Sequence, residues 1–433
     1  MTARVEPAEP TAASGRPISL TDANGASLRA AHGGAEADKK HLRIGIDGGC
    51  WLNQRGYGRY TRCLLKALAE RHADCTFYFF ADPQTAEALD LPANFHTVRV
   101  GTREAAALAA SAGGRRSIRD LLRMGWAVRG APIDVFFFPS AYTYFPILRS
   151  LPMLVTIHDV IAERHPGQVF AAPRFRKFWN MKMKLAVRQA TRILTVSDHA
   201  RDGILEQFRV QSDRVDVILE APDPVFQPLS EPKTPSEVLP NRGLEGDFPY
   251  LLYVGGLSPH KNLPALVEAF ARITSGGKNP DLRLLLVGDY EKDVFLSAYE
   301  GLRSLVDAKQ LGNRVCFTGF VPDEALVHLY NRATLLVMPS LEEGYGLPAA
   351  EAASCGTPVV ISEVGPMGAI LAGGAWTIRP ENVDELATAL ATLLEDEPRR
   401  QAMGAEALRR IRDASWERAA DQLYEILLRT ARK

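Results

Sequence analysis

The chain has 433 residues, of which 46% are hydrophobic and 24% are charged, and its 51 basic residues balance its 51 acidic residues. This length predicts two or three domains with sizeable cores, and the composition excludes disorder of the whole chain. A formal net charge of zero argues against a protein that binds nucleic acid through bulk positive charge.

Residues 1–40 are rich in Ala, Gly, Pro, Thr and Glu and lack hydrophobic periodicity, which is typical of a disordered tail. They lack a basic start followed by an apolar block, so we expect no secretory signal. No run approaches the roughly 18 apolar residues of a membrane-spanning helix. The five cysteines are scattered without a C-x-x-C pair, so we expect a cytoplasmic protein without a disulfide scaffold or cysteine-based zinc site.

Residues 41–225 alternate short apolar runs with helical patterns. A strand is predicted at 42–47, and a glycine-rich loop and a helical pattern follow it. The later apolar runs that predict buried parallel strands are 76–80, 135–138, 153–157 and 193–196. We therefore expect an N-terminal Rossmann-like domain over 41–225.

A proline-rich segment at 226–248 interrupts this alternation and is predicted to be a linker. The alternation restarts over 249–412, the predicted C-terminal Rossmann-like domain. Its predicted strands are 250–254, 282–287, 315–317, 335–338 and 358–361, and its predicted helices are 263–273, 294–309, 323–331, 348–354 and 383–394. Within the last segment, 413–433, an amphipathic pattern predicts a closing surface helix at 416–428.

Two α/β halves of similar length predict two facing Rossmann-like domains with a cleft between them. In open α/β sheets, ligands bind at the carboxyl ends of the strands. We therefore expect the functional site in this cleft, on loops that follow the strands of both halves.

The stretch 338–360 carries the most specific chemistry in the chain. A proline at 348 suits the first turn of a helix, so the preceding backbone amides would face outward at a helix N-terminus and favour an anion such as a diphosphate. These amides belong to Gly344, Tyr345, Gly346 and Leu347. Glu343 and Glu351 flank them, and each carboxylate could accept two hydrogen bonds from the vicinal diol of a sugar or a ribose. A solvated turn with two ordinary surface glutamates is the alternative.

This run resembles the E-x7-E signature of the family-4 retaining glycosyltransferases, which have the GT-B fold, and the resemblance extends from about residue 42 to the C-terminus. In that family the first glutamate contacts hydroxyls of the donor sugar and the second holds the nucleotide ribose. The match assigns these roles to Glu343 and Glu351. It also implies that the N-terminal domain binds the acceptor and the C-terminal domain binds the nucleotide sugar.

The loop after the first strand of the second half resembles the phosphate loop of this family, where a lysine neutralises the leaving diphosphate. The match gives Lys261 that role and places Gly255 and Gly256 at the donor. Many relatives carry an arginine at the position of Gly256, so His260 or another cation would have to replace it. The alternative is an exposed lysine in a strand–helix loop.

A histidine and a glycine-rich loop of the first half complete the predicted site. His158 follows an apolar strand, and related enzymes have a histidine there that faces the donor sugar; a structural histidine is the alternative. The adjacent Asp159 could orient the ring or cap the following turn. The family's N-terminal glycine loop approaches the donor phosphates or the acceptor, which implicates Gly56, Gly58 and Arg59. A strand-to-helix turn is the alternative for this loop, and its G-x-G lacks the third glycine of a nicotinamide dinucleotide fingerprint.

Two further features bear on partners. The chain has no D-x-D and no H-E-x-x-H motif, so we expect neither a metal nor a cofactor. The stretch 174–192 is basic, contains aromatic residues and has no acid, which predicts an amphipathic helix that can contact anionic lipid. A solvated helix on the domain surface is the alternative.

Together these features indicate a retaining, metal-independent hexosyltransferase of polysaccharide biosynthesis, with His158, Glu343 and Lys261 as catalytic residues. It would move a sugar from GDP-mannose or a UDP-sugar to a hydroxyl of a glycan or lipid-linked acceptor, in the cytoplasm at the inner face of the membrane. We expect no nucleic-acid partner. The alternatives are a GT-B glycoside phosphorylase, which would depend on phosphate instead of a nucleotide, and a non-catalytic subunit that binds nucleotide sugars.

Overall fold

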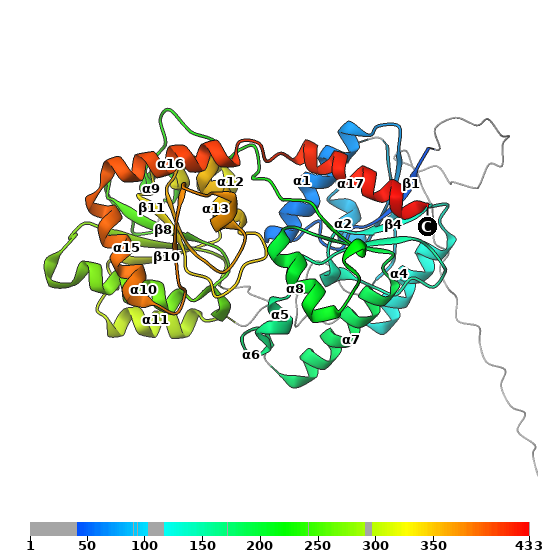
Figure 1. The fold of residues 1–433 in the computed structure, drawn as a ribbon, viewed down its shortest axis with the longest axis horizontal. Helices are drawn as coiled ribbons and strands as arrows, with labels where there is room; N and C mark the ends of the chain where they lie inside the picture. The colour runs from blue at the N-terminus through cyan, green and yellow to red at the C-terminus, as the bar shows by residue number, and fades with distance from the viewer. Residues whose placement is uncertain are drawn as a thin grey trace, which may run out of the picture.

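The computed structural model describes residues 41–89, 91–92, 94–102, 117–170, 172–240, 242–290 and 297–432. The predicted tail and the start of the predicted helix 294–309 lie outside these ranges. Two α/β lobes, each built on one parallel sheet, lie side by side (Figure 1). This arrangement confirms the predicted fold class, in which two Rossmann-like domains face each other.

The first lobe contains a seven-stranded parallel sheet in the order β3-β2-β1-β4-β5-β6-β7. Its order reverses beside β1, and loops at such a switch point open toward the ligand. The strands are β1 (Arg43–Asp47), β2 (Thr76–Ala81), β3 (Phe95–Arg99), β4 (Val135–Phe138), β5 (Met153–Thr156), β6 (Arg192–Thr195) and β7 (Val215–Val217).

Helices cover both faces of this first sheet. Buried residues of α4, α7 and α8 share one apolar core, and buried residues of α1 belong to the core on the other face. The helices are α1 (Gly56–Arg71), α2 (Pro83–Glu87), α4 (Ile118–Gly130), α5 (Ile161–Arg164), α6 (Pro166–Val169), α7 (Pro173–Gln189) and α8 (Asp198–Phe208).

The second lobe contains a six-stranded parallel sheet in the order β10-β9-β8-β11-β12-β13. Its strands are β8 (Tyr250–Val254), β9 (Arg283–Val287), β10 (Val315–Gly319), β11 (Leu335–Met338), β12 (Val359–Ser362) and β13 (Ala375–Ile378). Its helices are α10 (Leu263–Thr274), α11 (Tyr299–Ala308), α12 (Asp323–Arg332), α13 (Leu347–Ser354), α14 (Met367–Ile370), α15 (Val383–Glu395) and α16 (Glu397–Ile411).

The predicted linker is a packed segment. Its short helix α9 (Pro235–Val238) contacts α12 of the second lobe, and Phe226, Leu239 and Phe248 are buried. The backbone amide of Leu229 donates a hydrogen bond to Asn331 Oδ1 at 2.8 Å. The segment therefore lies against the second lobe for much of its length.

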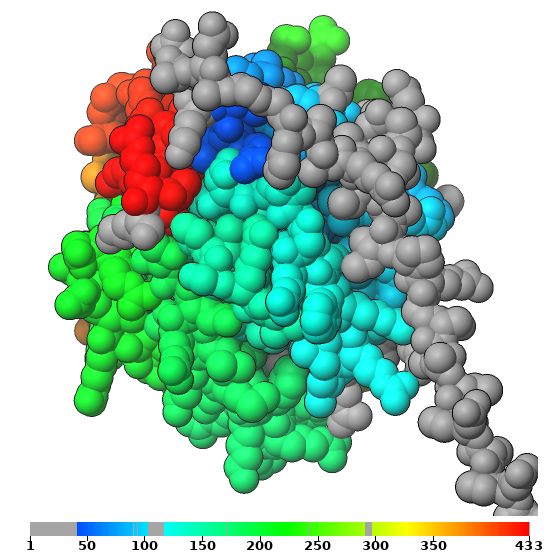
Figure 2. Space-filling model, turned by 90° about the vertical axis from the view of Figure 1, so that its right-hand side faces the viewer, coloured from blue at the N-terminus to red at the C-terminus, as the bar shows by residue number. Residues whose placement is uncertain are grey.

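The last helix, α17 (Trp416–Ala431), returns to the first lobe. It packs along α1, and Figure 2 shows the red C-terminal residues beside the blue N-terminal ones. The apolar stripe predicted for this helix is buried, because Trp416, Ala420, Leu423 and Leu427 all face the core. The helix was predicted as a surface element, and the structure shows that one of its sides completes the core of the first lobe.

Within the described part of the chain, no helix is both long enough and apolar enough to span a bilayer. The structure also revises the predicted basic stretch. The ammonium group of Lys182 turns inward and donates to the Tyr142 carbonyl at 3.0 Å, and Arg192 pairs with Asp216 at 2.6 Å. The indole of Trp179 is buried in the core. These groups therefore do not belong to an exposed surface of α7.

Candidate functional site

A cleft of about 1000 Å³ lies between the two lobes. It is lined by loops that follow the carboxyl ends of strands in both sheets, as expected for this fold class. Twelve of the predicted site residues line it: Gly56, Arg59, His158, Gly255, Gly256, Lys261, Glu343, Gly344, Tyr345, Gly346, Leu347 and Glu351. The cleft thus brings together groups from four separate stretches of sequence.

Gly58 does not line the cleft. A Cβ at this position would lie 1.9 Å from the backbone oxygen of Asn53, closer than any side chain could be accommodated. Glycine is therefore needed here for the close approach of two backbone segments, which supports the strand-to-helix turn interpretation at this position.

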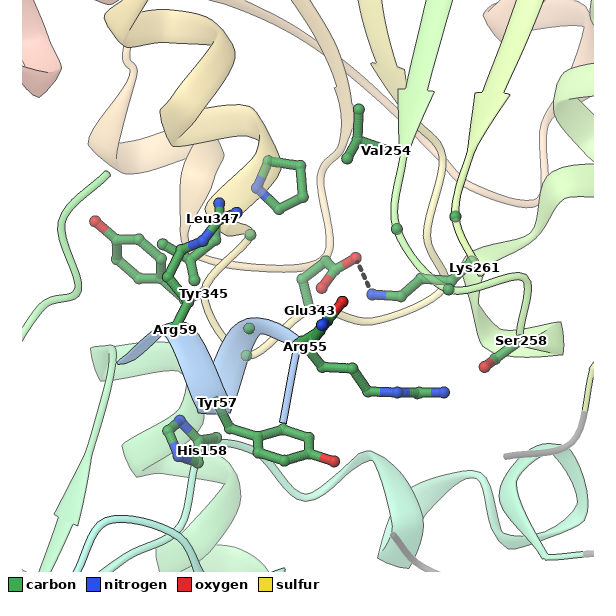
Figure 3. A pocket seen from close by; sticks show the side chains of 18 of the residues that line it. Arg55, Tyr57, Arg59, His158, Val254, Ser258, Lys261, Glu343, Tyr345 and Leu347 are labelled. Atoms are coloured by element: carbon green, nitrogen blue, oxygen red, sulfur yellow. Dashed lines mark hydrogen bonds and ion pairs between the residues drawn. The ribbon is translucent and has the colours of Figure 1, made fainter. Parts of the chain in front are cut away.

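Glu343 and Lys261 form the centre of the second-lobe wall. The Lys261 ammonium donates to Glu343 Oε1 at 2.7 Å, as Figure 3 shows, and the Ser340 hydroxyl donates to the same oxygen at 2.6 Å. Lys261 belongs to a short 3-10 turn after β8, and Glu343 lies on the loop between β11 and α13. A carboxylate and an ammonium therefore face the cleft as one pair.

Glu351 lies on α13 and is almost fully buried. It accepts a hydrogen bond from the Tyr330 hydroxyl at 2.8 Å and pairs with the guanidinium of Arg59, which comes from the first lobe. Arg59 also pairs with Asp323 at the start of α12, and its guanidinium lies over the Phe226 ring. The carboxylate assigned to the ribose is thus occupied by a cation from the opposite lobe.

His158 is held on both of its ring nitrogens. Nε2 donates to the Pro139 carbonyl at 3.0 Å, and Nδ1 lies 3.4 Å from Glu220 Oε1. The Tyr60 ring meets the imidazole edge-on, with centroids 4.8 Å apart. Burial raises the pKa of Glu220, while the hydrogen bond from His158 opposes this shift. The imidazole therefore has a fixed orientation at the cleft wall.

The loop 344–347, for which outward-facing amides are predicted, presses against the first lobe. A Cβ on Gly344 would lie 2.6 Å from the His158 carbonyl oxygen, and Gly346 has φ = 100°, where glycine is favoured. The Ser197 hydroxyl donates to the Gly344 carbonyl at 2.6 Å and accepts from the amide of Ala200 at 3.0 Å. Ser197 thus caps α8 and contacts the opposite lobe.

The structure bears on two of the questions left open by the sequence, the roles of Asp159 and His260. Asp159 accepts a hydrogen bond from the Ile161 amide at 3.0 Å, so it caps the following turn. His260 is not the cation that replaces an arginine at Gly256. Burial, reinforced by the neighbouring Lys261 charge, lowers the pKa of His260 to about 3, so the imidazole is neutral at physiological pH.

Arg55 is a cleft residue that the sequence did not single out. It precedes α1 and lines the cleft, and Figure 3 shows its side chain in an extended conformation there. Glu220, Tyr330 and Asp323 were also missed. They lie far from the glycine-rich motifs along the chain, and the sequence offers no spacing signal that would connect them to the site.

Among the described residues, no group of three or more His, Cys, Asp or Glu side chains is placed to hold a metal ion. Independence from metal remains a prediction, because a nucleotide diphosphate can bring its own cation.

Comparisons with known proteins cover both lobes. A family model described as "Glycosyltransferase Family 4" matches residues 55–224, and one described as "Glycosyl transferases group 1" matches residues 237–410. The O-antigen chain mannosyltransferase B of Escherichia coli is 28% identical over 315 residues, 69% of this chain and 75% of that protein. The D-inositol 3-phosphate glycosyltransferase of Rhodococcus jostii (strain RHA1) is 28% identical over 242 residues, which cover 55% of this chain and 52% of that protein.

Solved structures share the two-lobe architecture. Sucrose-phosphate synthase (tll1590) from Thermosynechococcus elongatus superposes with a TM-score of 0.69 at 22% identity, covering 89% of this chain and 98% of that one. Anabaena Alr3699/HepE in complex with UDP and glucose gives a TM-score of 0.65 at 18% identity, covering 89% and 99%. The family models and this shared fold lead to one conclusion: the chain belongs to glycosyltransferase family 4 and has the GT-B fold.

Proposed function

We propose that this chain is a retaining hexosyltransferase that moves a sugar from a nucleotide-sugar donor, GDP-mannose or a UDP-sugar, to a hydroxyl of a glycan or lipid-linked acceptor. The observation that carries this proposal is the Lys261–Glu343 pair, at 2.7 Å, on the wall opposite His158 in the same cleft. The similarity to an O-antigen mannosyltransferase and to a structure that binds UDP and glucose supports it.

The chemistry follows from the charges of the cleft. As the bond between the sugar and the diphosphate breaks, negative charge develops on the leaving oxygen, where fixed positive groups stabilise it. Lys261, the amides of 344–347 and the guanidinium of Arg55 supply that charge. The acceptor hydroxyl forms its bond on the face that the diphosphate leaves, and its proton passes to a diphosphate oxygen. Glu343 and His158 hold the sugar during this exchange.

Arg59 then has a role in donor binding. In the structure it neutralises the buried carboxylate of Glu351. A ribose that bonds to Glu351 displaces this guanidinium, which is then available for the negative diphosphate. Binding of the nucleotide thus exchanges one anionic partner of Arg59 for another, while Glu351 keeps the hydrogen bond from Tyr330 and gains those of the ribose hydroxyls.

Calorimetric titration with UDP, GDP and ADP tests directly whether Glu351 binds the nucleotide. We expect one nucleotide to bind, and the Glu351→Ala variant to bind it much more weakly. The matched control is Glu324→Ala, which removes an exposed carboxylate from nearby α12. Phosphate-dependent cleavage of a disaccharide without a nucleotide would instead identify a phosphorylase, and tight nucleotide binding without turnover of any acceptor would identify a non-catalytic subunit.

We further propose that the first lobe contacts an anionic membrane in the cytoplasm. The exposed side of α7 carries Met181 and Leu185 among the basic residues Lys177, Lys184 and Arg188. On α4, which packs on the same face of the sheet, three large apolar side chains recur at every fourth position and are exposed: Ile118, Leu122 and Trp126. Apolar side chains flanked by cations suit the boundary between anionic headgroups and acyl chains.

Trp126 reports on this contact. Its indole is 54% exposed, whereas Trp51, Trp179 and Trp416 are buried and the half-buried Trp376 lies on β13 of the second lobe. We expect its fluorescence emission to shift to shorter wavelength with vesicles that contain anionic lipid, and not with zwitterionic vesicles. A Leu122→Ser, Met181→Ser double variant should lose most of the shift. Failure of the native chain to bind anionic vesicles at low salt would rule out the membrane contact while leaving sugar transfer untouched.

A further inference from the structure

Glu342 lies immediately before Glu343, yet its side chain points to the other lobe. Its carboxylate is buried and meets three groups of the first lobe. Arg164 donates to Oε1 at 2.6 Å, and His165 Nε2 donates to Oε2 at 3.0 Å. His199 Nε2 lies 3.7 Å from Oε1, beyond hydrogen-bond distance. One carboxylate of the second lobe is thus enclosed by groups from the first lobe.

Physical chemistry makes this contact demanding. A carboxylate removed from water is unfavourable unless charged donors surround it. Burial raises the pKa of Glu342, but the neighbouring groups His199, Arg164 and His165 outweigh burial and lower the pKa to about 2. Glu342 is therefore ionised throughout the physiological range. If the lobes moved slightly apart, the Glu342 carboxylate would lose its partners while still buried. It would be hydrated by water only if the lobes separated fully.

Arg164 makes a second ion pair, which lies at the surface of the first lobe. Arg164 also pairs with Glu206 of α8 at 2.7 Å, so its guanidinium bridges a carboxylate of its own lobe and one of the other lobe. Beside this cluster, α6 packs on the turn that carries Lys261. The cluster and the reactive pair are thus neighbours on one strip of the interface between the lobes.

We infer that Glu342 is a positioning residue, which clasps the loop 343–347 to the first lobe and thereby sets the closed geometry of the cleft. The expected effect on kcat rests on the proposed transferase function. Glu342 contacts neither donor nor acceptor in this account. It acts through its neighbour in the chain, because fixing the Glu342 carboxylate against Arg164 fixes the backbone from which Glu343 projects.

The chain offers a matched set of variants. Glu342→Gln keeps the shape and removes the charge, and Arg164→Gln removes the main partner from the other lobe. Glu206→Gln is the control, since it removes the second partner of Arg164 without touching the contact between lobes. If Glu342→Gln fails to fold, Glu342→Asp retains the charge on a shorter side chain.

We expect Glu342→Gln and Arg164→Gln each to lower kcat ~10- to 100-fold, as for small misplacements of reacting groups, with KM for the donor changed less than about threefold. The double variant should be no slower than the slower single variant, because both remove the same contact. Glu206→Gln should stay within about twofold of the native chain. The inference would be wrong if the losses of kcat in the two single variants added up in the double variant. It would also be wrong if Glu206→Gln lowered kcat as much as Glu342→Gln does.

Small-angle X-ray scattering separates this inference from the proposed function. In the ligand-free protein we expect a larger radius of gyration for Glu342→Gln and Arg164→Gln than for the native chain or Glu206→Gln. This readout needs no substrate, so it holds even if no sugar transfer is detected. An unchanged radius in both variants would contradict the clasp even if the chain proves to be a transferase.

Discussion

The two walls of the cleft are built in different ways. The motifs of the second-lobe wall lie in two short stretches, 255–261 and 340–351, and residues within 287–289 and 320–326 also contribute to its lining. Both glutamates of these motifs have a partner within their own lobe. Lys261 pairs with Glu343, and Tyr330 donates to Glu351. This wall therefore exists as a preassembled half-site for a charged ligand.

The first-lobe wall comes from segments far apart in the chain. Arg55 and Arg59 flank the start of α1, and His158 follows β5. Two of its contacts reach across the cleft, because Arg59 pairs with Glu351 and the Ser197 hydroxyl bonds to the loop at Gly344. The comparison teaches that the second lobe holds its key charged groups in contacts of its own, while the first lobe adds cations from separate segments whose effect depends on how closely the lobes approach. The predictions below test this difference, from the largest expected effect to the smallest.

Removal of the second-lobe cation should have the largest effect. Lys261→Ala should lower kcat ~100- to 1000-fold, the usual loss when one group that stabilises a developing oxyanion is removed. The control is Lys278→Ala, which removes an exposed lysine of the same lobe and should leave kcat unchanged. An unchanged kcat in Lys261→Ala would show that another group stabilises the leaving diphosphate. The second-lobe wall would then not be the preassembled half of the site.

Loss of the buried carboxylate should come next. Glu351→Gln keeps the shape of the side chain but loses its charge, and it should weaken nucleotide binding ~10- to 100-fold in calorimetry, the value of a charge-assisted hydrogen bond or two. Tyr330→Phe removes only a neutral donor to the same carboxylate and should weaken nucleotide binding only a few-fold. Native affinity in Glu351→Gln would exclude Glu351 from the nucleotide site.

A smaller effect is expected from the first-lobe cation. Arg55→Ala should lower kcat ~10-fold, because one of several positive groups near the diphosphate is lost. The companion variant His260→Asn should not change kcat through charge, since the imidazole is already neutral. A larger loss in His260→Asn than in Arg55→Ala would show that the substitute for the arginine expected at Gly256 has been assigned to the wrong residue.

The smallest effect is on stability and depends on pH. The pKa of His260 falls from its ordinary 6.5 to about 3, so between these values the unfolded chain binds more protons than the native one. The free energy of unfolding should therefore fall as pH drops through this window, with about 2 kcal/mol lost at pH 5 through this group. In urea unfolding at pH 5 and pH 7.5, His260→Asn should show a smaller pH dependence than the native chain. Equal pH dependence in both proteins would contradict the buried neutral imidazole.

The sequence predicted the inner strands well, but of the four edge strands it predicted only β10. Fully buried strands such as β4 and β11 are uninterrupted apolar runs, and their predicted bounds match the structure. The strands β3, β7 and β13 lie at sheet edges, where only part of each strand is buried, so their polar residues conceal the apolar pattern. Partial exposure at an edge removes the signal that burial leaves in the centre of a sheet.

The same division holds for the site. Residues on the contiguous motifs, such as Glu343 and Lys261, could be assigned from spacing because a turn and a helix N-terminus fix their neighbours in the chain. Contacts between the two lobes could not be predicted from the sequence, because their partners lie far apart along the chain. Glu342 meets Arg164 and His165 across separations of 178 and 177 residues, and only the fold brings such positions together.

One measurement tests the central claim most directly. The purified chain is incubated with GDP-mannose or UDP-glucose and a hydroxyl acceptor, and proton NMR follows both the released nucleoside diphosphate and the anomeric configuration of the new bond. The account predicts release of the diphosphate and an α-linked product, with the configuration of the donor retained. A β-linked product, or sugar transfer that requires inorganic phosphate and no nucleotide, would contradict it.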